Sequence, residues 1–196
     1  MPPSASLTVA DIATRVTRAP ARLGRTRLVC IDGPAGSGKT SLAAALQAQL
    51  DDAAVLHMDD VYRGWDTDFA EVQARLRAQV VEPLAHERAA RYQRYDWDAG
   101  RFDAWVELPP PAVLLLEGVG SGATSLDPVI SLLLWVDADR DVRISRGVAR
   151  DGEDVLPKWL AWMEHEEVEH TRQRTRERAD LRLRGDGPDD GYAVLA

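Results

Sequence analysis

A glycine-rich stretch at residues 33–40 carries the clearest chemistry in the sequence. Its letters, GPAGSGKT, fill every fixed position of the pattern GxxxxGK[ST]. Glycines in such a loop let backbone N–H groups turn inward around phosphate oxygens, and a helix that starts at the loop adds the positive end of its dipole. Lys39 would reach the β- and γ-phosphates, and the Thr40 hydroxyl can bind Mg²⁺. The stretch therefore predicts a P-loop for a nucleoside triphosphate with Mg²⁺, and ATP is the nucleotide we expect.

Two further features of the chain favour this interpretation. Lys39 and Lys158 are the only lysines among 24 basic residues, so a lysine falls at the required position in a chain that otherwise uses arginine. A dinucleotide-binding turn would need GxGxxG, but Gly36-Ser37-Gly38 is followed by Lys-Thr-Ser. The residues expected to contact the nucleotide are Gly33, Ala35, Gly36, Ser37, Gly38, Lys39, Thr40 and Ser41.

Acidic residues follow two of the apolar runs of the sequence. Asp59 and Asp60 come directly after the run at 53–58, and Glu117 follows the run at 112–116. A carboxylate beside the phosphate loop can accept the proton of an attacking hydroxyl or hold Mg²⁺. Asp59 is the candidate base, although either aspartate could instead cap the following turn. The candidate Mg²⁺ ligands are Thr40, Glu117 and Asp59.

Three arginines recur at helical spacing within residues 137–151. Arg143, Arg146 and Arg150 lie at i, i+3 and i+7, which puts them on one face of a helix. Arginine forks match phosphate oxygens and can neutralise the charge that develops during phosphoryl transfer. We expect Arg143 and Arg146 to contact the nucleotide, and Arg146 and Arg150 to act in the transfer. The alternative is a solvated face that pairs with aspartates of the same segment, namely Asp139, Asp141 and Asp151.

The elements that must position these residues alternate between strands and helices. Continuous apolar runs predict buried strands at 26–32, 53–58, 112–117 and 130–137, with a short last strand at 180–184. Helical patterns lie at 39–50, 68–84, 139–150 and 155–178, after an N-terminal amphipathic helix. This order predicts a three-layer α/β P-loop fold with about five parallel strands and helices on both faces. The carboxyl ends of the strands, and the ligand, should then lie along one edge of the sheet.

Length and composition exclude several other classes of protein. The chain has 196 residues, a net charge of −8 and a single cysteine, Cys30, which excludes an internal disulfide framework. The acidic balance argues against nucleic-acid binding, and no apolar run approaches the roughly 20 residues of a membrane span. We see no signal peptide and expect a cytoplasmic protein whose partner is a small-molecule acceptor. A homo-oligomer is compatible with the sequence.

Five segments, in the same order, resemble the uridine kinase (uridine–cytidine kinase) family of P-loop kinases. They are IDGPAGSGKTSLA (31–43), MDDVYRGW (58–65), LLLEGVGSG (114–122), DADRDVRISRGVARD (137–151) and ADLRLRG (179–185). The resemblance implies Mg·ATP-dependent phosphoryl transfer to a nucleoside, with Asp59 as the carboxylate that activates the acceptor hydroxyl and Tyr62 as a substrate-side aromatic. It also implies one kinase domain at 1–196. Within it, residues 1–24 are an N-terminal helix and lead-in, residues from about 85 to 108 are a substrate flap, and residues from about 143 to 158 are a lid.

Aromatic and basic residues gather at 91–105, in the letters RYQRYDWDAGRFDAW. They could form the flap or the core of a small hairpin, and aromatic rings could stack on a nucleobase. The candidate substrate-binding residues are Asp59, Tyr62, Trp65, Tyr95, Trp97 and Arg101.

Other functions stay open at this point. A nucleoside monophosphate kinase would need further arginines, which Arg91, Arg94 and Arg101 could supply. A kinase for an antibiotic or another alcohol fits two departures from the family pattern, because Gly152-Glu153-Asp154 replaces its glycine- and arginine-rich lid and residues 65–68 replace its proline-containing segment. A regulatory NTPase switch is a third alternative, although the sequence has no NKxD guanine motif.

The acidic helix MEHEEVEH at 163–170 contains two histidines. His165 and His170 are five residues apart, which separates their rings around a helix, and the spacing is not the HExxH of a metal site. We therefore expect both histidines on a solvated face.

Overall fold

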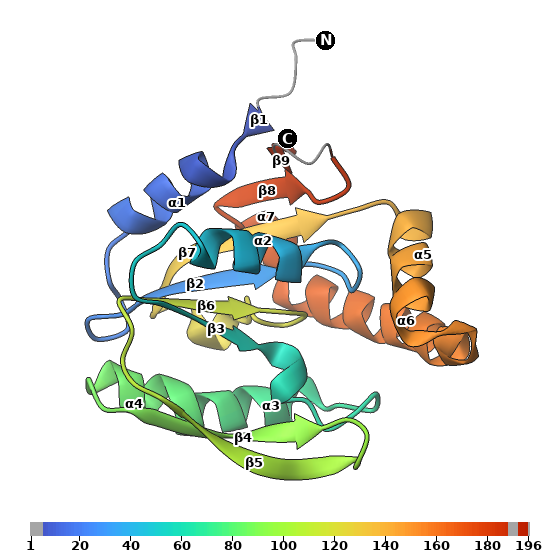
Figure 1. Cartoon of the computed structure of the whole chain (residues 1–196), viewed down its shortest axis with the longest axis horizontal. Coiled ribbons are helices and arrows are strands. Elements are labelled where there is room, and N and C mark those ends of the chain that lie inside the picture. The colour runs from blue at the N-terminus through green and yellow to red at the C-terminus, as the bar shows by residue number, and fades with distance from the viewer. Residues whose placement is uncertain (1–5, 188–191, 196) are drawn as a thin grey trace.

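Strand β2 (Arg27–Asp32) lies at the centre of a five-stranded parallel sheet in the computed structural model, which describes residues 6–187 and 192–195 (Figure 1). Its neighbours are β6 (Val113–Glu117) and β7 (Ile130–Asp137), and the edge strands are β3 (Ala53–His57) and β8 (Leu181–Arg184). Every neighbouring pair in this sheet is parallel. The strands match those predicted, and the order changes direction at β2, which makes the carboxyl end of β2 the expected ligand site.

One face of the sheet is covered by α1 (Val9–Arg18) and α2 (Lys39–Gln47). Ile12 of α1 and Leu42 of α2 share a buried core with Val29 of β2. The amphipathic pattern of α1 explains its placement, because its buried residues recur on one side of the helix. This core fixes the helix that begins at the end of the glycine-rich loop.

The opposite face is covered by α3 (Phe69–Leu76), α4 (Glu82–Ala85) and α6 (Leu156–Gln173), which completes the three-layer fold. A π-helical turn at Arg77–Val81 joins α3 to α4, so the stretch predicted as one helix at 68–84 is continuous but irregular. Trp162 of α6 belongs to the same core as the buried residues of α3. Helix α6 thus runs from the core toward the carboxyl edge of the sheet.

Helix α5 (Arg140–Asp151) follows β7 and packs against α6 beside that edge (Figure 1). The helix predicted at 155–178 is interrupted at Arg174, whose φ of 51° separates α6 from α7 (Thr175–Arg178). Helices α5 and α6 therefore form a corner at the end of the sheet where the ligand is expected.

An antiparallel hairpin, β4 (Ala90–Asp96) and β5 (Arg101–Leu108), lies outside the central sheet below α3 and α4 in Figure 1. Buried Tyr92 joins it to the main core, and the guanidinium of Arg75 on α3 lies 4.2 Å from the ring centre of Phe102. The segment predicted as a flap at 85–108 thus contains a hairpin that packs on the domain.

A small second pairing brings the two ends of the described chain together. Strand β1 (Ser6–Leu7) pairs antiparallel with β9 (Tyr192–Ala193), and Val194 bridges to Leu183 of β8. Among the described residues, no helix is both long enough and apolar enough to cross a membrane.

Candidate active site

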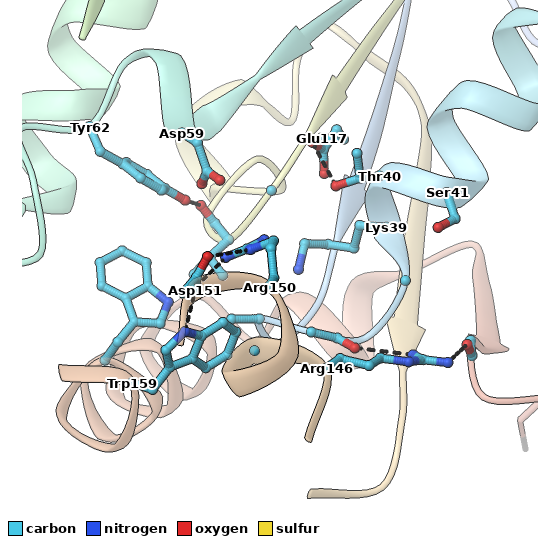
Figure 2. A pocket seen from close by; sticks show the side chains of 18 of the residues that line it. Lys39, Thr40, Ser41, Asp59, Tyr62, Glu117, Arg146, Arg150, Asp151 and Trp159 are labelled. Carbon is cyan, nitrogen blue, oxygen red and sulfur yellow. Dashed lines mark hydrogen bonds and ion pairs between the residues drawn. The ribbon is translucent and has the colours of Figure 1, made fainter. Parts of the chain in front are cut away.

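A cavity of about 560 Å³ opens at the carboxyl edge of the sheet, beyond the end of β2. It is lined by the phosphate loop, the turn after β3, the end of β6 and helices α5 and α6 (Figure 2). Trp97 at the tip of the hairpin also lines it. Its lining residues are Ala35, Gly36, Gly38, Lys39, Thr40, Ser41, Asp59, Tyr62, Trp65, Trp97, Glu117, Gly118, Val119, Arg146, Gly147, Arg150, Asp151, Trp159, Trp162, Gly185 and Tyr192. Most of the site residues expected from the sequence therefore meet in one cavity.

The glycine-rich loop follows β2 directly and ends where α2 begins at Lys39. Gly33 has a φ of 138°, and a Cβ built on it would lie 2.0 Å from the carbonyl oxygen of Val136, so only glycine fits. Gly38 caps α2 with a φ of 100°. Gly33 and Ser37 shape the loop but are not among the lining residues of the cavity.

Lys39 is buried, and its Nζ donates a hydrogen bond of 2.8 Å to the carbonyl oxygen of Pro34. The side chain thus lies back across its own loop and toward the cavity, as Figure 2 shows. An ammonium group held beside the loop's backbone N–H groups supplies the positive field that phosphate oxygens require.

The acidic residue at the end of β2, Asp32, anchors the loop from below. Its buried carboxylate accepts hydrogen bonds from the backbone N–H groups of Gly33, Gly120 and Gly122, at 2.7, 3.0 and 2.9 Å, and lies 3.1 Å from Nε2 of His170. Burial alone would raise the pKa of Asp32, but the contact with His170 and the N–H groups of Gly122 and Gly33 lower it. Asp32 was missed as a site residue, although an acid at the end of the first strand was a visible signal.

The expectation of a solvated face for both histidines is wrong for His170. It is buried on α6, bound to Asp32, and its ring centre lies 4.7 Å from that of Trp135. His165 is half-buried and packs against Phe69. The acidic residues around the histidines indicated a solvated face. Polar residues at helical spacing can, however, also face a buried loop.

Arg143 does not reach the cavity. Its Nη1 donates a 3.0 Å hydrogen bond to Glu166 of α6, and the two side chains are 13% and 2% exposed. Glu166 also accepts a 2.8 Å hydrogen bond from the backbone N–H of Ala35 in the phosphate loop. The expected contact of Arg143 with the nucleotide is therefore replaced by an ion pair behind the loop, because α6 supplies a buried carboxylate there.

Arg146 and Arg150 both line the cavity from the face of α5. The guanidinium of Arg146 donates to the carbonyl oxygens of Gly36 and Gly185, each at 3.1 Å, so it ties the phosphate loop to the end of β8. Arg150 pairs with Asp151, with donor–acceptor distances of 2.8 and 2.9 Å. The alternative pairing with an aspartate of its own segment thus holds for Arg150, while its position still faces the cavity (Figure 2).

Two oxygen ligands suited to Mg²⁺ lie together beside the loop. The Thr40 hydroxyl donates to Glu117 at 3.2 Å, and Glu117 ends β6 next to β2. Mg²⁺ commonly uses one or two protein oxygens and completes its shell with phosphates and water, so this pair fits it. Among the described residues, no group of three or more His, Cys, Asp or Glu side chains forms a metal cage.

Glu117 also contacts His57, whose Nδ1 lies 2.5 Å from the same carboxylate oxygen. The hydrogen bond that His57 donates to Glu117, together with the negative charge of that carboxylate, raises the pKa of His57. His57 precedes the aspartate pair and therefore connects the Mg²⁺ ligand to the end of β3.

Asp59 and Asp60 lie in a single 3₁₀ turn, Met58–Asp60, that follows β3. Asp59 lines the cavity across from Lys39 and Arg150 (Figure 2). Solvent reaches its side chain through the cavity, yet protein surrounds it on most sides, and this burial and the charge of Glu117 raise the pKa of Asp59.

Asp60 points elsewhere. Tyr92 of the hairpin and the charges of His57 and Arg94 act on its carboxylate, and it is not among the lining residues. The two neighbouring aspartates therefore have different surroundings, and only Asp59 faces the loop.

Aromatic side chains close the end of the cavity opposite the phosphate loop. Trp97 at the hairpin tip donates from its indole N–H to the backbone carbonyl of Asp59 at 3.0 Å, and its ring centre lies 5.7 Å from that of Trp65. Tyr62 also lines the cavity, with its hydroxyl bound to the carbonyl oxygen of Val119 at 2.6 Å. These three expected substrate-side residues meet at the cavity.

Tyr95 and Arg101 were also expected to bind substrate, but neither is among the lining residues. Tyr95 lies behind Trp97, with ring centres 5.5 Å apart, and packs against Phe102. Arg101 is exposed at the start of β5. Of the hairpin residues, only Trp97, in the turn between β4 and β5, lines the cavity.

Several lining residues were not found from the sequence. Trp159 and Trp162 are three residues apart on α6, a spacing that signalled one helical face, and Trp159 donates from its indole N–H to Asp151 at 2.7 Å. Gly185 and Tyr192 come from the end of the chain. No local pattern predicted that the segment after β8 would return to this edge.

Comparisons with known proteins give relatives in sequence and in fold. No family model matches the chain. A uridine kinase of Geobacillus sp. (strain WCH70) is 28% identical over 140 residues, which cover 63% of this chain and 66% of that protein. A uridine kinase of Macrococcus caseolyticus is 25% identical over 148 residues, or 67% of this chain and 72% of that protein. The aligned part thus spans about two thirds of the length of these relatives.

Solved structures have the same fold. A putative fructose transport system kinase from Silicibacter superposes with a TM-score of 0.62 at 23% identity, covering 83% of this chain and 95% of that one. A possible uridine kinase from Bacillus stearothermophilus gives a TM-score of 0.59 at 20% identity, covering 89% and 96%. The chain thus has the fold of the P-loop kinases, with its phosphate loop at the carboxyl edge of the sheet. Within that class, the relatives that its sequence resembles are uridine kinases.

Proposed function

We propose that the protein transfers the γ-phosphoryl group of Mg·ATP to a hydroxyl group of a nucleoside. The observation that carries this proposal is the position of Asp59 across one cavity from Lys39 and the phosphate loop. An acceptor between them would have its hydroxyl beside a carboxylate and its line of attack directed at the bound phosphates.

At the donor end, the backbone N–H groups of the loop and the ammonium of Lys39 bind the phosphate chain. Arg146 and Arg150 lie on the α5 wall of the cavity, where guanidinium groups can neutralise charge on the moving phosphoryl group. Thr40 and Glu117 would hold Mg²⁺, with Asp59 near enough in the cavity to contribute. Mg²⁺, when bound there, would offset the negative charge of the phosphate groups.

At the acceptor end, the carboxylate of Asp59 orients the hydroxyl and takes its proton. The hydroxyl oxygen forms a bond to the γ-phosphorus while the bond from that phosphorus to the bridging oxygen breaks, so the products are a phosphate ester and ADP. The raised pKa of Asp59 suits a proton acceptor, because it makes the carboxylate a stronger base than an ordinary aspartate.

A nucleoside is the acceptor that the aromatic lining favours. Trp65 and Trp97 offer flat apolar surface in the same cavity as Asp59, and a planar base can stack on such rings. Tyr62 is buried behind them and packs against Phe69 and Trp162. The sequence relatives at 25 to 28% identity are named uridine kinases, which points to the same substrate class.

The nucleoside monophosphate alternative is less well supported. Arg91 lies over Trp105, 4.7 Å from its ring centre, Arg94 interacts with Asp60, and Arg101 is exposed on the hairpin. Among the described residues, the arginines that line the cavity are Arg146 and Arg150, and both belong to the donor side. Among the described residues, a second phosphate group would therefore have to share these two arginines with the phosphates of ATP.

The test is ADP release from Mg·ATP with and without a panel of nucleosides, nucleoside monophosphates, fructose and glycerate. We expect stimulation by one or more nucleosides, and loss of activity when Mg²⁺ is chelated. Stimulation by a sugar or a monophosphate alone would overturn the acceptor class. Steady hydrolysis that no acceptor changes would instead indicate a regulatory NTPase.

A further inference from the structure

Helix α6 contains four buried polar residues that the proposed mechanism does not use, and two of them are bound to the phosphate loop or to Asp32 at its base. Glu166 and His170 are 2% and 6% exposed, and their spacing of four residues puts them on the same face of the helix. That face packs behind the phosphate loop. Burial of an ionisable group is costly unless the group is paired. The partners of these two side chains therefore indicate which segments the helix keeps in place.

Glu166 binds the phosphate loop at Ala35, a position that we call the apex of the loop. One carboxylate oxygen accepts from the backbone N–H of Ala35 at 2.8 Å, and the other accepts from Arg143 of α5 at 3.0 Å. Burial raises the pKa of Glu166, and the Ala35 N–H, Lys39 and Arg143 act in the opposite direction. One side chain thus connects the phosphate loop to α5, which we call the lid helix because it overlaps the lid segment expected from the sequence.

His170 holds the base of the same loop through Asp32. Nε2 of His170 lies 3.1 Å from the Asp32 carboxylate, which accepts the N–H of Gly33 at the start of the loop. Asp32 also accepts the N–H groups of Gly120 and Gly122, so the segment after β6 is fixed to the same point. The contact with His170 is therefore one link in a fully buried network.

The apex contact lies near the transferable phosphate. Lys39 Nζ donates to the carbonyl oxygen of Pro34, the residue before Ala35. The ammonium group therefore lies at the corner of the loop formed by Pro34 and Ala35. A P-loop lysine contacts the β- and γ-phosphates, which puts the Ala35 corner beside the γ-phosphate of a bound triphosphate. A small displacement of this corner would misalign N–H groups that must already be oriented when charge develops.

We propose that Glu166 and His170 are positioning residues that clamp the phosphate loop at its apex and its base, and that Glu166, through Arg143, ties the lid helix to the loop. The proposal rests on the donor role given to the loop above, but not on the identity of the acceptor.

The test compares Glu166→Gln with Glu167→Gln, a matched change at an exposed position of the same helix. The glutamine can still accept the Ala35 N–H, but it loses the charge that binds Arg143. Loss of a charged hydrogen-bond partner corresponds to a loss of affinity of about tenfold. We expect Glu166→Gln to weaken ATP binding in calorimetry about tenfold and to lower kcat, with the KM of the acceptor unchanged. Glu167→Gln should leave all three values as in the wild type.

A double-mutant cycle tests the link to α5. If Arg143 and Glu166 act as one unit, Arg143→Gln should change ATP binding less in the Glu166→Gln background than in the wild type. His170→Gln, which keeps a donor toward Asp32, should give a smaller loss than His170→Ala. Simple additivity of Arg143→Gln and Glu166→Gln would overturn the link.

The thermal midpoint separates positioning from stability. A variant with a lower midpoint but unchanged ATP affinity and kcat, measured well below that midpoint, would overturn the proposal, since a purely structural residue behaves in this way. If Glu166→Gln weakens ATP binding while no acceptor supports turnover, the clamp stands and the proposed acceptor chemistry fails. The two conclusions are therefore distinguishable.

Discussion

The two ends of the cavity are built in different ways. At the donor end, Asp32, Lys39 and Glu166 are buried and bound to backbone groups of the phosphate loop at hydrogen-bond distance. At the acceptor end, Trp97 is 41% exposed and is held by one hydrogen bond and by contacts with other aromatic rings. The donor end is fixed by a polar network, whereas the acceptor end depends on a hairpin tip.

This difference reflects what each end has to recognise. Phosphate groups are the same in every nucleoside triphosphate, so a rigid set of oriented N–H groups serves them best. An acceptor varies in shape, and a hairpin outside the central sheet can vary without disturbing the loop. Substitutions should accordingly separate into those that change ATP use and those that change acceptor use.

The largest effect is expected at the donor end. Lys39→Ala removes the ammonium group that binds the phosphates and should lower kcat/KM for ATP about a thousandfold, the scale seen when one preorganised donor to developing charge is lost. The exposed Lys158, the other lysine, is the matched control, and Lys158→Ala should keep wild-type kinetics. Steady-state rates at saturating acceptor give the comparison. Equal losses in the two variants would mean that Lys39 has no special role.

A smaller and selective effect is expected at the acceptor end. Trp97→Ala should raise the acceptor KM about tenfold, because contact of an aromatic ring with a base contributes about 1 to 3 kcal/mol. The KM for ATP should not change. Trp105→Ala, on the same hairpin but 47% exposed and away from the cavity, is the control. A rise in the KM for ATP instead would remove the distinction between the two ends.

The smallest expected effect is a shift in pH dependence. Burial and the charge of Glu117 raise the pKa of Asp59 above its ordinary value of 3.8. The proton acceptor must be ionised, so turnover should be lost as the pH falls through this raised pKa. Carboxyl-carbon NMR of the nucleotide-free protein, assigned with Asp59→Asn, measures it directly. A midpoint at or below 3.8 would contradict the surroundings described for Asp59.

The same shift has a consequence for stability. Because the pKa of Asp59 is higher in the folded protein than in the unfolded chain, ionisation of this carboxylate opposes folding at neutral pH. Asp59→Asn should therefore unfold at a temperature no lower than the wild type. Thermal unfolding followed by circular dichroism tests this sign.

The sequence predicted the position of the phosphate loop between β2 and α2 well because its pattern is local. One contiguous motif at 33–40 carries the turn, the lysine and the Mg²⁺ hydroxyl, and the apolar runs beside it indicated the strands and helices. The strand-end carboxylates Asp59 and Glu117 could be assigned because parallel strands end at one edge. These features need only short-range pattern and the general topology of the sheet.

The remaining errors concern partners that are distant in the sequence. Arg143 was assigned to phosphate because nothing near it indicated Glu166, which lies 23 residues away on the next helix. His170 was expected in solvent because its buried partner, Asp32, is 138 residues away. Helical spacing shows which residues share a face but not whether that face is polar because it meets water or because it meets a buried loop.

The most direct test of the account compares Asp59→Asn with Asp60→Asn, two neighbouring changes of the same chemistry. The account predicts that Asp59→Asn lowers kcat about a thousandfold, within the range for loss of a general base, while ATP affinity measured by calorimetry stays near the wild-type value. Asp60→Asn, whose carboxylate faces the hairpin, should keep most of the wild-type kcat. A wild-type rate in Asp59→Asn, or a loss of ATP affinity as large as its loss of rate, would contradict the central claim that Asp59 activates the acceptor.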